Sequence, residues 1–208
     1  MDPKVETRLD PPTASAVARR GLILAAVACR GHIETGLGDA AAEALQPRII
    51  EWLNACGLMD ALEPEEHAIF VAPLGALSER QQLDAGWRIE GAAILAWALG
   101  KYPLPPHDAK IDPFRVAEAL GFLWDEAPGF VRFAQLRDRA QLNAYRELVC
   151  TIHCRLREVE LRPKRDDLDQ WIQPAWLRAL GLARNNPLME GDLAIEGEPL
   201  HRVEPATV

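Results

Sequence analysis

Basic side chains recur along one side of a predicted helix in the second half of the chain. Arg139, Arg146, Cys150, His153 and Arg157 fall within about 60° of one another on a helical projection. This basic stripe flanks an apolar arc, which would place the guanidinium groups at the rim of the core. Guanidinium groups suit carboxylate or phosphate ligands. The stripe predicts either a small-anion site or ion pairs with neighbouring helices, and the acidity of the remaining chain favours ion pairs.

A second candidate group lies at the entry to an apolar helix. Arg88 and Glu90 project about 160° apart, so they do not pair with each other. Glu90 is surrounded by apolar positions and needs a partner from elsewhere, either as a structural ion pair or as a tuned acid or base. The structural role is favoured. If the long helix packs against helix 79–100, Arg146 or Arg157 would meet Glu90.

Metal chemistry is the third candidate. Cys150, His153 and Cys154 share one side of a helix, and Cys29-x-x-His32 could complete a ligand set. Thiolate and imidazole are suitable zinc ligands. However, the chain contains no Cys-x-x-Cys pair, and small thiols also line ordinary helix contacts. We therefore predict no metal, no cofactor and four reduced cysteines.

Several catalytic signatures are missing from the sequence. The chain has only two serines, Ser15 and Ser78, and neither lies in a Gly-x-Ser-x-Gly elbow. None of the four lysines follows a phosphate-binding glycine loop. Gly36-x-Gly38-x-x-Ala41 matches a dinucleotide fingerprint, but a helix rather than a strand is expected before it. No catalytic residue is predicted, and the sequence leans against an enzyme.

The charge distribution limits the classes of partner. The net charge of −8 argues against nonspecific binding to nucleic acid or to an anionic membrane. Residues 132–165 nevertheless hold nine Lys and Arg against four Asp and Glu. Arg19-Arg20 before the apolar run 21–29 resembles a lipoprotein signal. Three acids precede that run, so a buried helix in a soluble cytoplasmic protein is favoured over export.

The elements that must position these groups are helical. Alanine and leucine dominate the composition, and β-branched residues are modest. Thr13 or Ser15 caps a predicted helix that ends near residue 30, before Gly31. A second helical stretch starts near Asp39, and Pro47 is expected to split it or to begin a new helix.

Two longer helices form the predicted centre of the fold. Ser78 and Gln81 match a capping box, which opens helix 79–100. This helix is apolar all round from 91 to 99, so we expect it to be buried. The longest helix is predicted over roughly 130–160. Asp112-Pro113 should cap a helix that runs to about Leu123.

The predicted architecture is an all-α, single-domain multi-helix bundle with at most a small β-hairpin near residues 192–200. A helix is also expected around 168–181. The predicted organisation is a flexible arm over 1–12, one helical domain over 13–200 and a tail over 201–208.

Several motifs resemble the bacterial domain-of-unknown-function family numbered 4272. The central signature is matched by Trp87-Arg88-x-Glu90 and by the segment Leu95-Ala96-Trp97-Ala98-Leu99-Gly100. The amino-terminal half is matched by Ile50-Glu51-Trp52-Leu53, Gly57-Leu58 and Leu62-x-Pro64-x-Glu66. The later matches are His153-x-Arg155-x-Arg157 and Asp192-Leu193-Ala194-Ile195-x-Gly197-x-Pro199. Cys154 stands where the family has Trp. The resemblance brings no established activity.

Two functions remain open at the level of sequence. The leading hypothesis is a non-catalytic protein-binding module, such as an acidic inhibitor or an immunity-type partner of a basic protein. The alternative is a small anionic-ligand or enzymatic site, for which the ligand-binding candidates are Arg88, Glu90, Arg146, His153 and Arg157.

Overall fold

The computed structural model divides the chain into two compact units, which are described separately. The first spans Met1–Leu136 and the second spans Arg137–Val208. The described residues are 11–35, 40–105, 107–161, 188–189, 192–195 and 198–199, with side chains up to Arg157. The predicted bounds of the arm, the domain and the tail remain a prediction.

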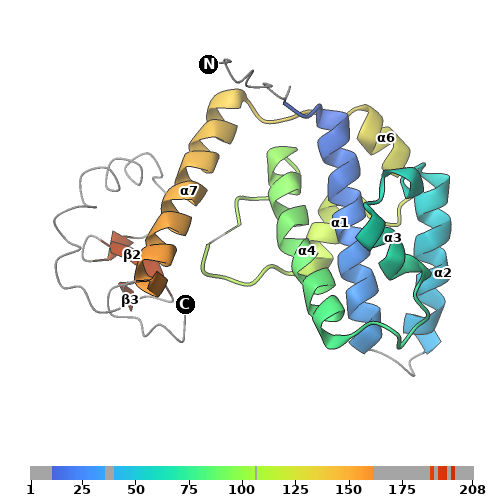
Figure 1. Ribbon diagram of the computed structural model, residues 1–208. Coiled ribbons are helices and arrows are strands. Elements are labelled where there is room, and N and C mark those ends of the chain that lie inside the picture. Colours follow the sequence, from blue (N-terminus) through green and yellow to red (C-terminus); the bar gives the residue numbers. More distant parts are fainter. Residues whose placement is uncertain are drawn as a thin grey trace, which may run out of the picture. The chain divides into compact units, whose positions relative to one another are not determined.

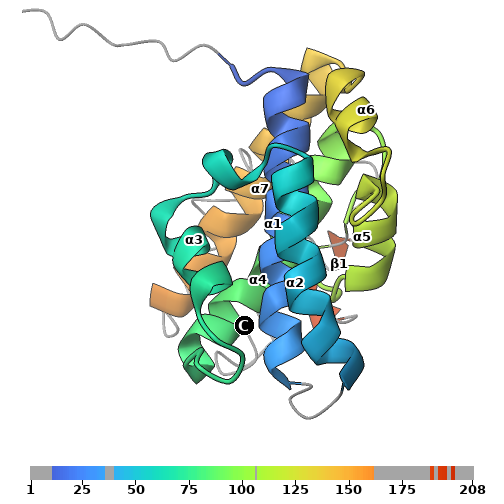
Figure 2. The same ribbon diagram turned by 90° about the vertical axis from the view of Figure 1, so that its right-hand side faces the viewer.

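In the first unit, all regular secondary structure within the described residues is helical, which confirms the all-α prediction. The helices are α1 (Ala14–Thr35), α2 (Ala40–Ala55), η1 (Met59–Ala61), α3 (Pro64–Val71), α4 (Glu79–Ala98), α5 (Pro113–Leu120) and α6 (Ala127–Arg132). Helix α1 lies between α4 on one side and the α2–α3 pair on the other (Figure 1). Figure 2 shows α2 and α3 covering the same side of α1. The hydrophobic core therefore surrounds α1.

Helix α1 is longer than the sequence predicted. The Thr13 hydroxyl accepts a hydrogen bond from the Ala16 amide at 3.2 Å, which confirms the predicted start. The helix continues through Gly31 to Thr35, so the predicted end near residue 30 was wrong. Gly31 is kept inside the helix because it packs against α4, where a larger side chain would not fit.

Helix α2 runs without interruption through Pro47, contrary to the predicted split. Proline removes one backbone hydrogen bond from a helix interior. Ile49 and Leu53 are fully buried and Trp52 is nearly so. Burial of this apolar face maintains the helix despite the missing bond.

The predicted caps of α4 and α5 are present. The Ser78 backbone amide donates to the side-chain oxygen of Gln81 at 3.0 Å, and the Gln81 backbone amide donates to the Ser78 hydroxyl. The Asp112 carboxylate accepts from the Phe114 amide at 3.0 Å. Helix α5 ends at Leu120 rather than near Leu123, because Gly121 adopts a left-handed conformation with φ of 69°.

Helix α4 packs against α1 through small side chains. Its buried face includes Ala85, Ala92, Ala93 and Ala96, and the predicted burial of its carboxy-terminal half is confirmed. A Cβ atom at Gly31 of α1 would lie 2.8 Å from the Ala85 Cβ. The two backbones therefore approach closely at this point. The small residues at the contact make that approach possible.

The second unit contains helix α7 and three short strands. Helix α7 spans Arg139–Leu161, so the predicted start near 130 was wrong. The Asp138 carboxylate accepts from the Gln141 amide at 2.9 Å, which places a cap at this later start. Strands β1 (Leu188–Met189), β2 (Asp192–Ile195) and β3 (Glu198–Pro199) pair antiparallel in that order.

The predicted helix around 168–181 lies outside the described residues. None of the helices that the structure describes is both long and apolar enough to cross a membrane.

Candidate functional site

The five predicted ligand-binding residues are divided between the two units. Arg88 and Glu90 lie on α4 of the first unit, and both are half-buried. Arg146, His153 and Arg157 lie on α7 of the second unit, and all three are exposed. Each group is therefore described within its own unit, and a common site built from all five remains a prediction.

Glu90 has a local partner within the first unit. Burial raises the pKa of the Glu90 carboxyl, while a hydrogen bond from the Ile111 backbone acts in the opposite direction. The carboxylate thus anchors the segment that connects α4 to α5. The predicted pairing of Glu90 with Arg146 or Arg157 concerns the relation between the two units, and it stays a prediction.

The basic stripe on α7 faces solvent along its described length. Arg139, Arg146, Cys150, His153 and Arg157 are all exposed. The buried arginine of this helix is instead Arg155, which shares the more buried side with Leu148 and Ile152. The sequence predicted an apolar arc on this helix from Leu142 to Val159. Leu148 and Ile152 of that arc are buried, whereas Val149 is 41% exposed. The sequence motif His153-x-Arg155-x-Arg157 contains the buried arginine but does not reveal which of its members is buried.

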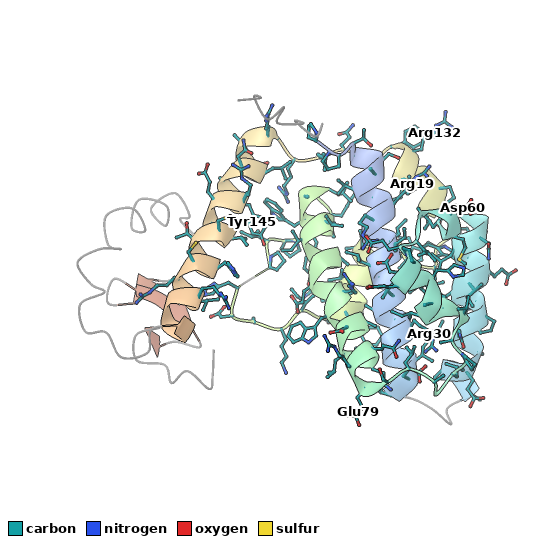
Figure 3. All side chains as sticks on the ribbon, in the orientation of Figure 1. Arg19, Arg30, Asp60, Glu79, Arg132 and Tyr145 are labelled. Carbon is teal, nitrogen blue, oxygen red and sulfur yellow. The ribbon has the colours of Figure 1, made fainter. Side chains whose placement is uncertain are left out.

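A buried ion pair in the first unit was not predicted. Arg30 and Glu34 lie one turn apart near the end of α1, and both side chains are inaccessible to solvent. Figure 3 labels Arg30 in the half of α1 that lies nearer to Glu79 at the start of α4. Arg30 Nη1 donates to Glu34 Oε1. The pair lies within a core that is otherwise almost wholly apolar.

The Arg30–Glu34 pair binds the loop between α3 and α4. Arg30 Nη2 donates to the carbonyl oxygens of Ala72 and Pro73, each at 3.2 Å. The second Glu34 oxygen accepts from the Gly75 amide at 2.8 Å. The pair therefore satisfies both donors and acceptors of a backbone segment outside any helix. We call Arg30, Glu34 and residues 72–75 the loop clamp.

The clamp also satisfies the end of α3. The last carbonyl groups of a helix have no partner within it and carry partial negative charge. Arg30 supplies a cation at this end, and Gln46 Nε2 of α2 donates to the carbonyl oxygens of Phe70 and Ala72. These contacts hold α3 against α1 and α2. Their chemistry is structural, because both charges are already neutralised by protein groups.

A second ion pair fixes the start of α3. Arg20 Nη1 of α1 lies 2.8 Å from Glu66 Oε2, and Arg20 Nη2 lies 3.2 Å from Glu63 Oε1. The buried Glu66 carboxylate also accepts from the Glu63 amide at 3.0 Å. Glu66 belongs to the Leu62-x-Pro64-x-Glu66 motif. The structure therefore assigns this motif residue a role in positioning α3.

An acidic surface extends over α2, η1 and α3. From Ile49 to Glu79 the chain has six Asp and Glu residues and no Lys or Arg. All but Glu66 are exposed, and these are Glu51, Asp60, Glu63, Glu65 and Glu79. Among the ion pairs found in the described part of the chain, none involves Glu51, Asp60 or Glu65. Most of this surface is therefore available to a partner.

The segment after α5 adds to the acidic surface beside the end of α2. The Trp52 indole donates to the Trp124 carbonyl oxygen at 3.0 Å, which fixes this segment against α2. The neighbouring Asp125 and Glu126 are exposed, and the Trp124 side chain is 51% exposed. Burial raises the pKa of the Cys56 thiol, and the nearby Asp125 charge raises it further. Asp125 therefore lies near Cys56, which directly follows the end of α2.

The four cysteines occupy different environments. Cys29 and Cys56 are half-buried, whereas Cys150 and Cys154 are exposed, and all four are free thiols. Burial raises the pKa of Cys29 to about 11. No group of three or more His, Cys, Asp or Glu side chains is arranged to hold a metal ion within the described residues.

We expect the cysteines to differ strongly in reactivity. The thiolate is the nucleophile in alkylation, so a raised pKa and burial should both protect Cys29. With iodoacetamide at neutral pH, Cys29 should react about 100-fold more slowly than Cys150. Peptide mass spectrometry over a time course measures these rates. Equal labelling of Cys29 and Cys150 in the native protein would contradict the assigned environments, and equal labelling is expected only in denaturant.

Comparison with known proteins places the chain in a family. No curated protein and no solved structure matches the chain. The resemblance of the motifs in the first half and in α7 to family 4272 is confirmed by a family model. The matched residues extend across the first unit and into the second. Because the model described as Domain of unknown function (DUF4272) matches residues 4–182, the chain belongs to that family.

Proposed function

We propose that the chain is a non-catalytic protein-binding module whose partner carries positive charge. The observation that supports this proposal is the acidic surface over α2, η1 and α3, in which 31 consecutive residues contain no Lys or Arg. Charge complementarity of this kind accelerates association and selects against partners of like charge. An inhibitor or immunity-type partner of a basic protein is the specific role that fits best.

The exposed Trp124 gives this surface an apolar anchor. Tryptophan is enriched among residues that dominate binding energy, particularly where polar groups surround it. Asp125 and Glu126 follow directly in the sequence, and Asp60 belongs to η1 beyond the end of α2. An arginine of the partner could stack on the indole and also meet a carboxylate.

Charge reversal on this surface tests the proposal. A variant with Asp60→Lys, Asp125→Lys and Glu126→Lys should lose affinity for a basic partner by at least ~10-fold. The matched control reverses three exposed acids outside this surface, Asp84, Glu118 and Glu147, and so changes the net charge equally. Partners captured from host lysate by the natural chain are identified, and their affinities for all three proteins are compared at low and high salt.

The outcomes separate the two functions considered for this chain. A basic partner that is lost only by the first variant, and that binds more weakly at high salt, supports the proposal. Equal binding to both variants contradicts it. Stabilisation of the natural chain by small anionic metabolites in a thermal-shift screen would instead favour the alternative ligand site.

A further inference from the structure

The outward face of α4 carries two large apolar side chains in solvent. Leu83 is 64% exposed and Trp87 is 65% exposed. Residues four apart are neighbours on a helix surface, so the two side chains form one patch. The opposite face of the same helix carries the alanines that contact α1. The larger apolar residues therefore point away from the core, which indicates an interaction surface rather than packing within the unit.

Charged side chains flank this patch in a particular order. Arg80 precedes Leu83 by three residues, and Glu90 follows Trp87 by three residues. On a helical projection all four lie within an arc of about 80°. Arg80 is highly exposed, and its contact with Asp84 is long at 3.7 Å, so the guanidinium remains accessible. From the amino-terminal end of α4, this face therefore presents one basic side chain, two apolar side chains and one acidic side chain.

This order is self-complementary. When two copies of the helix pack antiparallel about a two-fold axis, Leu83 of each copy lies opposite Trp87 of the other. In the same register, Arg80 of each copy lies opposite Glu90 of the other. A two-fold interface requires a surface that complements itself. In this arrangement the Leu83–Trp87 contact and the Arg80–Glu90 ion pair each occur twice, once in each half of the interface.

We propose that α4 binds α4 of a second copy of this chain, antiparallel, through Arg80, Leu83, Trp87 and Glu90. A foreign partner would need a matching basic and acidic group at the same spacing, whereas a second copy supplies both. Phe114 of α5 is also highly exposed, but Glu118 occupies the position four residues later, so it forms no comparable patch. Phe114 therefore provides a matched control.

Sedimentation of the full chain over a range of concentrations tests the proposal. The natural chain should associate reversibly to a dimer. Leu83→Glu with Trp87→Glu should weaken dimerisation by at least ~100-fold, because the central apolar contact is lost and four acids are brought together. Phe114→Glu should leave the dimer unchanged. Circular dichroism establishes that each variant retains the helical fold.

Charge exchange tests the register itself. In a dimer of the Arg80→Glu variant, two glutamates would oppose each other at each end of the interface. In a dimer of the Glu90→Arg variant, two arginines would oppose each other at each end. Each variant alone should dimerise at least ~10-fold more weakly. An equimolar mixture should form a heterodimer, because every Arg–Glu pair is restored. A dimer that neither variant weakens would overturn the proposed register.

A cross-linking measurement covers the case in which Glu90→Arg fails to fold, since Glu90 also accepts from the Ile111 backbone. Leu83→Cys and Trp87→Cys chains, each with Cys150→Ser and Cys154→Ser, are mixed and oxidised. The mixed disulfide should form faster than either homodimer disulfide. A chain that stays monomeric at all concentrations, as it would if another part of the chain covered this face, would overturn the proposal.

Discussion

Replacing Arg30 with Met should lower the free energy of unfolding by about 3–5 kcal/mol. The substitution retains an apolar side chain of similar length but removes the charge that neutralises Glu34. Both side chains are inaccessible to solvent, so the Glu34 carboxylate would be left buried and unpaired. The Pro73 carbonyl oxygen would also lose the donor from Arg30, and the Ala72 carbonyl oxygen would keep only the hydrogen bond from Gln46. This is the largest effect that we expect from any single substitution in the chain.

Urea denaturation followed by circular dichroism measures the effect of Arg30→Met. Arg19→Met on the same helix is the control, because Arg19 is exposed, and it should change stability by less than about 0.5 kcal/mol. Adding Glu34→Leu to Arg30→Met should recover part of the loss, since no charge then remains stranded. A loss no larger than that of the control would contradict the role of the loop clamp.

Gly31→Ala should destabilise the protein by about 1–3 kcal/mol. The added Cβ would lie 2.8 Å from the Ala85 Cβ, 3.1 Å from the Gln82 carbonyl oxygen and 3.2 Å from the Gly86 amide nitrogen. Two of these atoms belong to the α4 backbone, so α1 and α4 would have to move apart. In an isolated helix the same substitution would be favourable, because alanine has the higher helix propensity. The sign of the effect therefore comes from packing alone.

Gly86→Ala is the matched control on the opposing helix. A Cβ at Gly86 would meet nothing within 4 Å, so this substitution should raise stability by up to about 1 kcal/mol. Chemical denaturation of both variants gives the comparison. If Gly31→Ala stabilised the protein as Gly86→Ala does, the close approach of α1 and α4 would be wrong.

Local signals in the sequence predicted most of the helices. The Ser78–Gln81 box and the Asp112-Pro113 start depend on groups within a few residues of each other, so they are visible in the sequence itself. The same reasoning could have placed the start of α7, because Asp138 precedes Gln141 by three residues. The predicted start near residue 130 did not take this capping signal into account.

Residues whose role depends on a distant partner were predicted less well. Glycine favours the end of a helix, so the sequence predicted that the helix would stop before Gly31. Only the close packing against α4 explains why the helix continues through this residue. The spacing of Arg30 and Glu34 is visible on an apolar helix, but the sequence does not show that residues 72–75 are their partners. Pro47 is tolerated because α2 buries an apolar face elsewhere along its length.

The candidate ligand site shows the same limit. Helical projection correctly grouped Arg146, His153 and Arg157 on one face of α7, and that face is exposed. Projection concerns one helix at a time, so it could not decide whether Arg88 and Glu90 share a site with them. Projection also places Leu83 and Trp87 on one side of α4, but it does not show whether that side faces the core or the solvent.

The packing of α1 against α4 has a consequence for folding kinetics. These helices form the most extensive helix pair in the first unit, yet residues 36–78 separate them in the sequence. Closing such a long segment costs conformational entropy before any contact between the helices is gained. The contact order is accordingly higher than in a bundle of sequential neighbours, and folding is slower. The segment that contains α2 and α3 therefore influences the folding rate through its length as well as through its own contacts.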